Sequence, residues 1–523
     1  MSPQLLAMAI APLLGLFILG IGNGYMATLI SLSLDAAGES QVVVGVVSSA
    51  YFIGLALGSM FNDRLLLAIG HIRAYGTFAS LVAVTVLLQG LFFDPTAWFV
   101  LRLIGGWATV GVFLVIESWL LTSGDSHVRG RLLALYMIAI YASGVIGQLL
   151  LSVTQAMGDT APFMVVGIMA SLSVLPMAMI PRVTPLLDKA EPLSPLRLIT
   201  LTPTGVMGSF GSGLLVAAVY TLMPLYLQRS GFGVAAVGQL MAIMILGAML
   251  LQYPVGRWSD RHDRQLVLIL IGIFCALVSV VVLMVPLPPW GLAGLLFLLG
   301  GGGFSVYAVA VSHAADRAPA GALVPMSQGL LLINALGSTI SPPAVSPIMA
   351  ALGDGALFGA FGTFGAVLVL FFGWRRMVRP APVPVVPFSP STPLSSVGAE
   401  LAVTEQWVQG ARSHEYMEDL SDAVPDVDVA EPIVGPPVEE NHYVAYYDEE
   451  GFHDGYSDAL HDAPDTTGDE VARHAGHSEG DAEPVALTHS EGDAEPVALT
   501  QGEGTDRTAP SQTPPFDEAP GQR

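Results

Sequence analysis

Hydrophobic residues in this sequence gather into long runs that contain few charges. A helix needs about 20 mostly apolar residues to cross a bilayer, and twelve such runs alternate with short polar or turn-rich breaks. The pattern therefore predicts an all-α polytopic membrane protein with twelve transmembrane helices. The expected limits of the helices are 5–32, 41–62, 72–93, 96–121, 131–153, 161–181, 203–228, 233–254, 265–286, 289–313, 323–350 and 354–375.

One break between these runs is longer than the others. The stretch RVTPLLDKAEPLSPLRLIT, from Arg182 to Thr200, divides the runs into six and six. Such a layout is typical of a fold made of two six-helix halves. We therefore expect an N-terminal six-helix bundle at 1–181, a cytoplasmic linker at 182–202 and a C-terminal six-helix bundle at 203–379.

Positive charges between the runs predict how the chain is oriented. Lys and Arg in short loops are retained on the cytoplasmic side of a membrane. One set of alternate breaks carries fourteen of them, whereas the other set carries only Arg229. We expect a multi-pass protein of the bacterial inner (plasma) membrane with both termini in the cytoplasm. The fourteen are Arg64, Arg73, Arg129, Arg131, Arg182, Lys189, Arg197, Arg257, Arg261, Arg264, Arg317, Arg375, Arg376 and Arg379.

The composition separates this membrane body from an acidic tail. The whole chain is 53% hydrophobic and 12% charged, about half the charged share of a soluble domain. Residues 1–379 carry 16 Lys or Arg and 13 Asp or Glu, whereas residues 380–523 carry 4 and 30. The tail begins with a proline-rich stretch and has little apolar periodicity, so we expect a disordered acidic cytoplasmic tail at 380–523. It is a candidate segment for binding an unknown cytoplasmic partner.

Several classes of function find no support in the sequence. There is no basic stripe with interleaved aromatic residues, so we expect no binding of nucleic acid. The single cysteine, Cys275, excludes an intrachain disulfide. Histidines of the tail lack metal-ligand spacing and no GxxxxGK[ST] phosphate loop occurs, so we expect no metal, cofactor or nucleotide. The polar groups of the spans are isolated rather than clustered at one depth, which speaks against an enzyme.

The most specific motif lies between the eighth and ninth runs. It reads GRWSDRHDR and includes Gly256, Asp260, Arg261, Asp263 and Arg264. A glycine lets two helices approach closely, and acids with arginines can form a charge lattice at the helix ends. We expect such a lattice to hold the outward-open state of the protein and to break when the cavity opens inward. The alternative is a basic loop that serves only topology.

The first half carries a looser copy of this motif. It contains Gly58, Asp63, Arg64 and Arg73, and its Asp-Arg pair is displaced by one position relative to the second motif. Both loops resemble the signature of the major facilitator superfamily. The phrases GHIRAYG, ESWL and SDRHDRQLVL are similar to the YcaD-like bacterial branch of that superfamily. The resemblance implies two six-helix bundles that surround a central cavity, with the two loops as gating elements.

Two charges fall inside the fourth run, Arg102 and Glu117. A charge in a bilayer costs about 2.5 to 3.5 kcal/mol on insertion scales, so we expect both to have a role. Fifteen residues span roughly 22 Å of helix, so the two cannot pair with each other. The segment RLIGGWATV that begins at Arg102 is similar to the superfamily's fourth-helix signature, which implies proton coupling or contact with an anionic solute. The alternative is an arginine that extends toward the headgroups.

Glu117 lies close in sequence to Arg129 and Arg131. Two roles are open: a gate salt bridge that parts during transport, and a carboxylate that carries a proton. We favour the gate, because the nearby arginines keep the acid ionised.

The resemblance also implies that the first, fourth, seventh and tenth spans line the cavity. The polar and aromatic residues that they offer are Asn23, Tyr25, Trp107, Tyr220 and Tyr307. Hydrogen bonding between helices is an equal alternative for each of them.

We expect a secondary active transporter that moves a small solute by alternating access, with a proton gradient as the driving force. Its partners would be the solute, protons and the lipid bilayer. The alternative is a non-transporting membrane sensor or scaffold that keeps the fold and signals through the acidic tail.

Overall fold

The structure is a computed structural model of the whole chain, and it describes residues 3–122, 126–179, 195–317 and 323–378. Within these ranges every regular element is an α-helix. The predicted tail at 380–523 and residues 182–194 of the predicted linker lie outside the described residues.

Fourteen helices occur in the described part of the chain, and twelve spans among them are long and apolar enough to cross a membrane. The prediction of twelve transmembrane helices is confirmed, with ends that differ from the expected limits by a few residues. The helices are α1 (Pro3–Ala36), α2 (Gln41–Ile69), α3 (His71–Leu91), α4 (Pro95–Thr122), α5 (Ser126–Gln155), α6 (Ala161–Leu172), α7 (Val174–Ala178), α8 (Pro195–Leu201), α9 (Pro203–Arg229), α10 (Val234–Ser259), α11 (Arg264–Met284), α12 (Pro289–Ala315), α13 (Leu323–Leu352) and α14 (Ala356–Val378).

Two short helices depart from the expected layout. The sixth span is divided into α6 and α7 at Ser173, and Pro176 lies just beyond this point. Proline has no N–H, so it cannot donate the helical hydrogen bond at that place. The second short helix, α8, lies within the predicted linker. Thr202 follows it and caps α9 by accepting a hydrogen bond from the amide of Gly205 at 3.4 Å.

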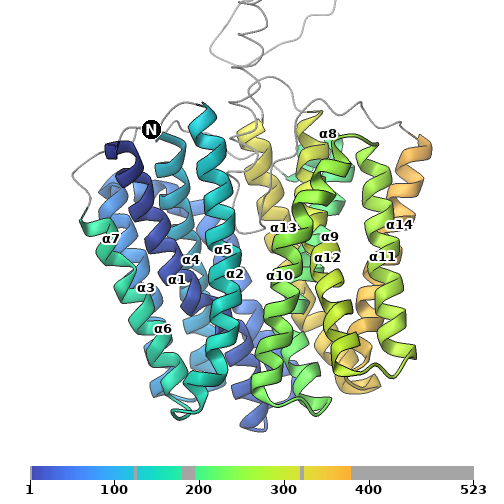
Figure 1. Cartoon of the computed structure of the whole chain (residues 1–523), viewed down its shortest axis with the longest axis horizontal. Coiled ribbons are helices and arrows are strands. Elements are labelled where there is room, and N and C mark those ends of the chain that lie inside the picture. The colour runs from blue at the N-terminus through green and yellow to red at the C-terminus, as the bar shows by residue number, and fades with distance from the viewer. Residues whose placement is uncertain (1–2, 123–125, 180–194, 318–322, 379–523) are drawn as a thin grey trace, which may run out of the picture. The chain divides into compact units, whose positions relative to one another are not determined.

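The spans run side by side, and the first six gather apart from the last six (Figure 1). The first group, α1 to α7, and the second group, α9 to α14, are called the two halves below. Contacts between the halves are made mainly by α2 with α13, α5 with α10, and α1 with α9.

A glycine-mediated helix pair recurs in both halves. A Cβ atom at Gly106 of α4 would collide with the carbonyl group of Tyr51 in α2. At the corresponding place of the second half, a Cβ atom at Gly300 of α12 would collide with the carbonyl group of Met244 in α10. Small residues let membrane helices approach until their backbones touch. The same packing device therefore builds both halves.

The two ends of the helical body carry most of the charged residues. One end, here called the Asp260 end, holds the GRWSDRHDR loop and the start of α1, which is marked N in Figure 1. The opposite end, here called the Arg229 end, holds Asp35, Arg229 and Asp354.

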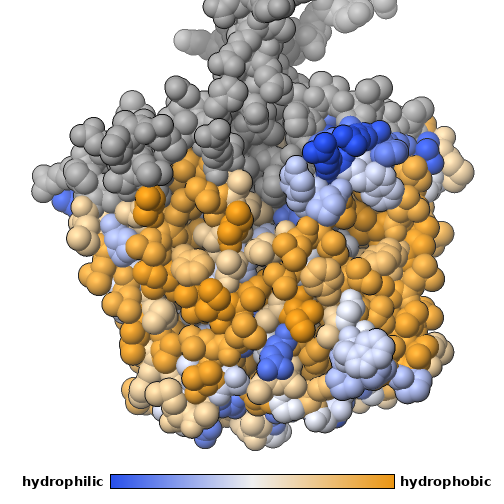
Figure 2. All heavy atoms as spheres, in the orientation of Figure 1, coloured by the Kyte–Doolittle hydropathy of each residue, from blue (hydrophilic) through white to orange (hydrophobic). Residues whose placement is uncertain are grey.

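An apolar surface lies between these ends. Hydrophobic residues cover most of the face shown in Figure 2, and hydrophilic residues gather mainly toward the two ends. Large side chains in the middle of the spans are exposed, among them Val84, Ile138, Leu277 and Leu370. Helices with such a surface satisfy their backbone groups internally and present hydrocarbon to lipid. The protein is a multi-pass membrane protein.

Candidate functional site: a central cavity closed at one end

A cavity lies between the two halves. Its walls come from α1, α2, α4 and α5 of the first half and from α9, α10, α12 and α13 of the second. The space between the walls is about 1290 Å³ when the open side is included.

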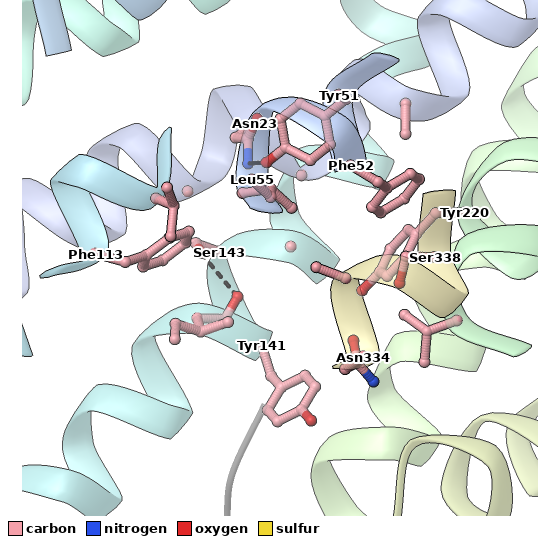
Figure 3. A pocket seen from close by; sticks show the side chains of 18 of the residues that line it. Asn23, Tyr51, Phe52, Leu55, Phe113, Tyr141, Ser143, Tyr220, Asn334 and Ser338 are labelled. Carbon is pink, nitrogen blue, oxygen red and sulfur yellow. Dashed lines mark hydrogen bonds between the residues drawn. The ribbon is translucent and has the colours of Figure 1, made fainter. Parts of the chain in front are cut away.

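Arg102, Tyr51 and Asn23 form a polar cluster on the wall of the first half. The amide nitrogen of Asn23 donates a hydrogen bond to the hydroxyl of Tyr51 at 3.3 Å (Figure 3). The guanidinium carbon of Arg102 lies 4.5 Å from the centre of the Tyr51 ring. The Arg102 side chain therefore bends over an aromatic face and lines the cavity.

Arg102 is deeply buried, with 4% of its surface exposed. It forms no ion pair with any carboxylate of the described residues, and its Nε atom has no hydrogen-bond partner among them. An uncompensated buried charge is costly. Within the described part of the chain, therefore, no carboxylate neutralises this cation at the wall of the cavity.

Aromatic rings make up much of the remaining wall. They come from both halves and surround the space shown in Figure 3, where Tyr51, Phe52, Phe113, Tyr141 and Tyr220 are labelled. The ring of Tyr220 meets that of Phe304 edge to face at 5.6 Å. The wall therefore combines one cation with a largely apolar, aromatic surface.

Three of the predicted cavity residues, Arg102, Asn23 and Tyr220, line the cavity. Three others, Tyr25, Trp107 and Tyr307, are not among the lining residues, and each contacts neighbouring helices. Tyr25 donates a hydrogen bond to the carbonyl of Pro162 at 2.9 Å.

The other two pack against aromatic or aliphatic groups. The ring of Trp107 meets that of Phe78 edge to face at 5.3 Å. Tyr307 belongs to a small buried cluster with Val311 and Leu330. Trp107 and Tyr307 therefore take part in packing between helices, which was the alternative to contact with a solute.

The lining residues that sequence reasoning did not single out include Tyr51, Phe52, Phe113, Tyr141 and Phe304. Tyr51 and Phe52 lie on the second span and Tyr141 on the fifth, which were not counted among the cavity spans. A hydroxyl inside a long apolar run, as at Tyr51 and Tyr141, is the signal that could have identified them.

Glu117 is buried near the Asp260 end and does not line the cavity. Its Oε1 atom accepts a hydrogen bond from the hydroxyl of Tyr136 at 2.6 Å. The positions of Arg129 and Arg131 lie on α5, but their side chains lie outside the described part of the structure. The predicted salt bridge between Glu117 and these arginines therefore stays a prediction.

The GRWSDRHDR loop forms a charge lattice. Arg264, 1% exposed at its side chain, lies 3.2 Å from Asp260 and 3.2 Å from Asp316. Asp263 accepts hydrogen bonds from the first amides of α11 and pairs with Arg376 at 2.9 Å. The lattice thus connects α10, α11, α12 and α14, which all belong to the second half. Gly256 is buried in α10, and Arg261 is exposed.

The looser copy in the first half is built differently. Asn62 lies four residues after Gly58, the spacing that separates Asp260 from Gly256. Its amide nitrogen donates to the carbonyl of Trp107 at 2.9 Å. The displaced Asp63 is half-buried and forms no ion pair among the described residues.

Arg64 and Arg73 are exposed. Because of the shift by one position, Asn62 forms a neutral hydrogen bond where Asp260 of the second half forms an ion pair with Arg264.

An ion-pair network joins the two halves at the Arg229 end. Arg229 of α9 lies 2.6 Å from Asp35 of α1 and 3.3 Å from Asp354, which precedes α14. Gln41 of α2 donates a hydrogen bond to Asp354 at 2.6 Å. Residues of the first half thus bind residues of the second directly. In the sequence, Arg229 stands out only as an isolated positive charge.

Close packing supports this junction. Gly45 of α2 lies against Ser346 and the carbonyl of Pro342 in α13, with no room for a Cβ atom. Ser31 of α1 donates a hydrogen bond to the carbonyl of Thr221 in α9 at 2.7 Å. These contacts lie in the parts of the helices near the Arg229 end. The cavity is therefore closed on that side.

Twelve apolar spans in two halves, with a cavity between them that is closed at one end, define a membrane transporter. A family model described as Major Facilitator Superfamily matches residues 12–330. The chain belongs to the major facilitator superfamily, which confirms the resemblance seen in its sequence.

Relatives of known name agree with this assignment. The uncharacterized MFS-type transporter YcaD of Salmonella arizonae is 32% identical over 372 residues, which cover 71% of this chain and 96% of that protein. The YcaD protein of Salmonella typhi is 32% identical over 374 residues, again covering 71% and 96%.

Solved structures are similar in fold. The nucleoside transporter NupG superimposes with a TM-score of 0.60 at 15% identity, covering 71% of this chain and 99% of that one. A D-xylose–proton symporter superimposes with a TM-score of 0.57 at 13% identity, covering 70% and 96%. At these identities the likeness concerns the fold alone.

Proposed function

We propose that this protein is a secondary active transporter that moves a small solute across the bacterial inner membrane by alternating access, coupled to protons. The observation that carries the proposal is the cavity between the halves, closed at the Arg229 end by ion pairs that join them. Two bundles that rock about a central site open one end as they close the other. The contacts at the Arg229 end are of the kind that such a motion breaks and re-forms.

The distribution of positive charge supports the orientation of this cycle. The proposal puts the Asp260 end in the cytoplasm, because arginines gather in the loops of that end. The state with a closed Arg229 end is then the inward-facing one. The lattice around Arg264 is formed in this state and lies within one half. In the proposal the lattice therefore holds the second bundle together as a rigid unit, and the expectation that it breaks when the cavity opens inward is not retained.

The coupling to protons rests on the chemistry of the chain. The sequence contains no nucleotide-binding phosphate loop, so an ion gradient is the available source of free energy. Glu117 is a buried carboxylate held by Tyr136. We retain the gate as its preferred role and the carrying of a proton as the second.

A reversible lock tests the proposal. A Gln41→Cys/Asp354→Cys pair, introduced together with Cys275→Ser, places two thiols where the halves meet. The side chains of Gln41 and Asp354 meet across the junction, and a reducible bis-methanethiosulfonate cross-linker, which bridges thiols whose Cα atoms lie too far apart for a direct disulfide, is expected to lock the Arg229 end. The locked protein is expected to move no solute, and reduction is expected to restore movement.

The measurement uses proteoliposomes that contain trapped pyranine, with a pH gradient imposed and candidate solutes screened for linked proton movement. Cysteine-free protein, treated with the same cross-linker, is the matched control. Cross-linked and reduced proteins that transport equally well would contradict alternating access at this junction. Absence of any solute movement by the reduced protein would favour the non-transporting sensor.

A further inference from the structure

We propose that the solute is an amphipathic organic anion, with a flat and mostly apolar body and a single carboxylate or similar acidic group. This inference rests on the proposed transport function, because it identifies the cavity with the solute site. It follows from three properties of the cavity wall: its charge, its aromatic surface and the hydrogen bonds that its polar side chains already form.

Arg102 is the one charged residue among the described residues that line the cavity. Arg102 lines the cavity, and no Asp, Glu, Lys or His is among the other lining residues. Its guanidinium meets the face of Tyr51, which attracts a cation but does not neutralise it. A buried guanidinium binds a carboxylate with two parallel hydrogen bonds. A bound anion therefore supplies the counter-charge that the described residues lack.

A second donor lies beside this arginine. The hydroxyl of Tyr51 accepts a hydrogen bond from Asn23, and no acceptor for the proton of Tyr51 is present among the described residues. Asn23 thereby orients the hydroxyl oxygen and leaves its proton available. Arg102 and Tyr51 together form a donor pair suited to one acidic group.

The body of the solute is indicated by the rest of the wall. Six aromatic side chains from both halves line the cavity, and most of the other lining residues are aliphatic or glycine. Rings prefer stacked or edge-to-face contacts with other rings. A flat apolar body between these rings is removed from water on both faces, which favours an aromatic solute.

The serine and asparagine side chains of the wall already donate hydrogen bonds to the protein, whereas the hydroxyl of Tyr141 has no partner among the described residues. The hydroxyls of Ser59, Ser143 and Ser338 donate to backbone carbonyls at 2.8, 2.9 and 3.3 Å. The amide nitrogen of Asn334 donates to the carbonyl of Ser209 at 2.9 Å. A solute with many hydroxyls would leave several of them unpaired on entering this cavity, at a considerable free-energy cost. An organic cation would meet Arg102 without any carboxylate to bind it.

Equilibrium binding to the purified full-length protein tests the inference. Radiolabelled naphthalene-2-carboxylate is the probe, in a scintillation proximity assay, with four competitors: naphthalene-2-carboxamide, 2-naphthylmethylammonium, acetate and D-xylose. The carboxylate is expected to bind, the isosteric amide at least tenfold more weakly, and the other three not detectably. Lack of binding by the carboxylate overturns the proposal. So does equal binding by the amide, the ammonium ion, acetate or xylose.

Variants of the cavity locate the binding. Arg102→Gln is expected to weaken binding of the carboxylate at least tenfold and to leave the amide unchanged, while Arg102→Lys retains part of the affinity. Tyr220→Leu is expected to weaken both ligands. Arg257→Gln is the matched control, because Arg257 is an exposed arginine at the Asp260 end and does not line the cavity. Full carboxylate affinity in a folded Arg102→Gln protein overturns the assignment.

Binding is measured without any gradient, so it is independent of transport. If the carboxylate binds and reconstituted protein moves nothing, the transport function fails and the ligand class stands. If protein in liposomes transports a neutral or cationic solute through this cavity, the ligand class fails and the transport function stands. Should Arg102→Gln not fold, the ligand comparison on the unaltered protein and the Tyr51→Phe variant still decide the question.

Discussion

Arg229 in α9 and Asp35 in α1 form an ion pair with 2.6 Å between Nη2 and Oδ1, although the two residues belong to opposite halves. The same guanidinium reaches Asp354 at 3.3 Å. All three side chains are partly exposed, with 17% to 31% of their surface accessible. A partly exposed network is strong enough to favour one conformation and weak enough to be broken in a cycle.

The first prediction concerns this network. Arg229→Gln removes the central cation and is expected to shift the population toward a state open at the Arg229 end. An exposed pair contributes up to about 1 kcal/mol, so the ratio of the two states is expected to change by a factor of about five. Spin labels on α2 and α13 near this end, read by double electron–electron resonance, measure the separation of the halves.

Two controls accompany this measurement. Arg257→Gln removes an exposed arginine from the Asp260 end and is expected to leave the label distances unchanged. Since ion pairs on a surface are screened by salt, raising the ionic strength is expected to shift the unaltered protein in the same direction as Arg229→Gln. Unchanged distances in Arg229→Gln would mean that apolar packing alone holds the closed end.

The second prediction concerns the close helix pair of α10 and α12. A Cβ atom at Gly300 would collide with the carbonyl of Met244, whereas one at Gly303 would meet open space. Gly300→Ala is expected to lower the unfolding free energy by about 1 to 3 kcal/mol, the usual cost of overpacking. Gly303→Ala, three residues along the same helix, is expected to have little effect. Fluorescence-detected size-exclusion chromatography after heating compares the two, and equal losses would contradict the predicted backbone clash.

The third prediction compares two ion pairs of the same lattice. Asp316→Asn leaves the buried Arg264 with reduced compensation and is expected to cost on the order of 3 kcal/mol of stability. Arg376→Gln breaks the ion pair with Asp263. The side chains of Arg376 and Asp263 are 47% and 24% exposed, so the loss of this pair is expected to cost about 1 kcal/mol of stability or less. Thermal unfolding of the purified variants measures both. A larger loss from Arg376→Gln would reverse the order that burial predicts.

The fourth prediction separates the two roles of Glu117. Glu117→Gln keeps an acceptor for the hydroxyl of Tyr136 but removes the charge and the exchangeable proton. A gate role predicts that solute exchange and gradient-driven uptake change by the same factor, because both need the gate to move. We expect this outcome. Selective loss of gradient-driven uptake with normal exchange would instead assign proton carrying to Glu117.

Local properties of the chain were enough to predict the spans. Length and apolarity decide whether a helix can cross a bilayer, and both are read from contiguous residues. The separation of Asp260 and Arg264 by four residues is local in the same way, because the short turn between α10 and α11 keeps the two side chains close. The division of the sixth span at Ser173 was also accessible, since Pro176 marks it, but the span was predicted as one helix.

The sequence does not predict which side of each helix faces the cavity. Lipid and protein interior are both apolar, so the hydrophobic pattern of a span does not distinguish them. Tyr25, Trp107 and Tyr307 were therefore candidates equal to Tyr220, and only Tyr220 lines the cavity.

The sequence by itself determined the number of spans, their alternation and the position of the charged loops, because each depends on neighbouring residues. Only the tertiary structure decided that Tyr51 of α2 lies under Arg102 of α4, and that Asp35 meets Arg229 across 194 positions of the chain. Contacts of this kind depend on the rotation and crossing of packed helices. Those are set by small residues such as Gly106 and Gly300 acting with all their neighbours at once.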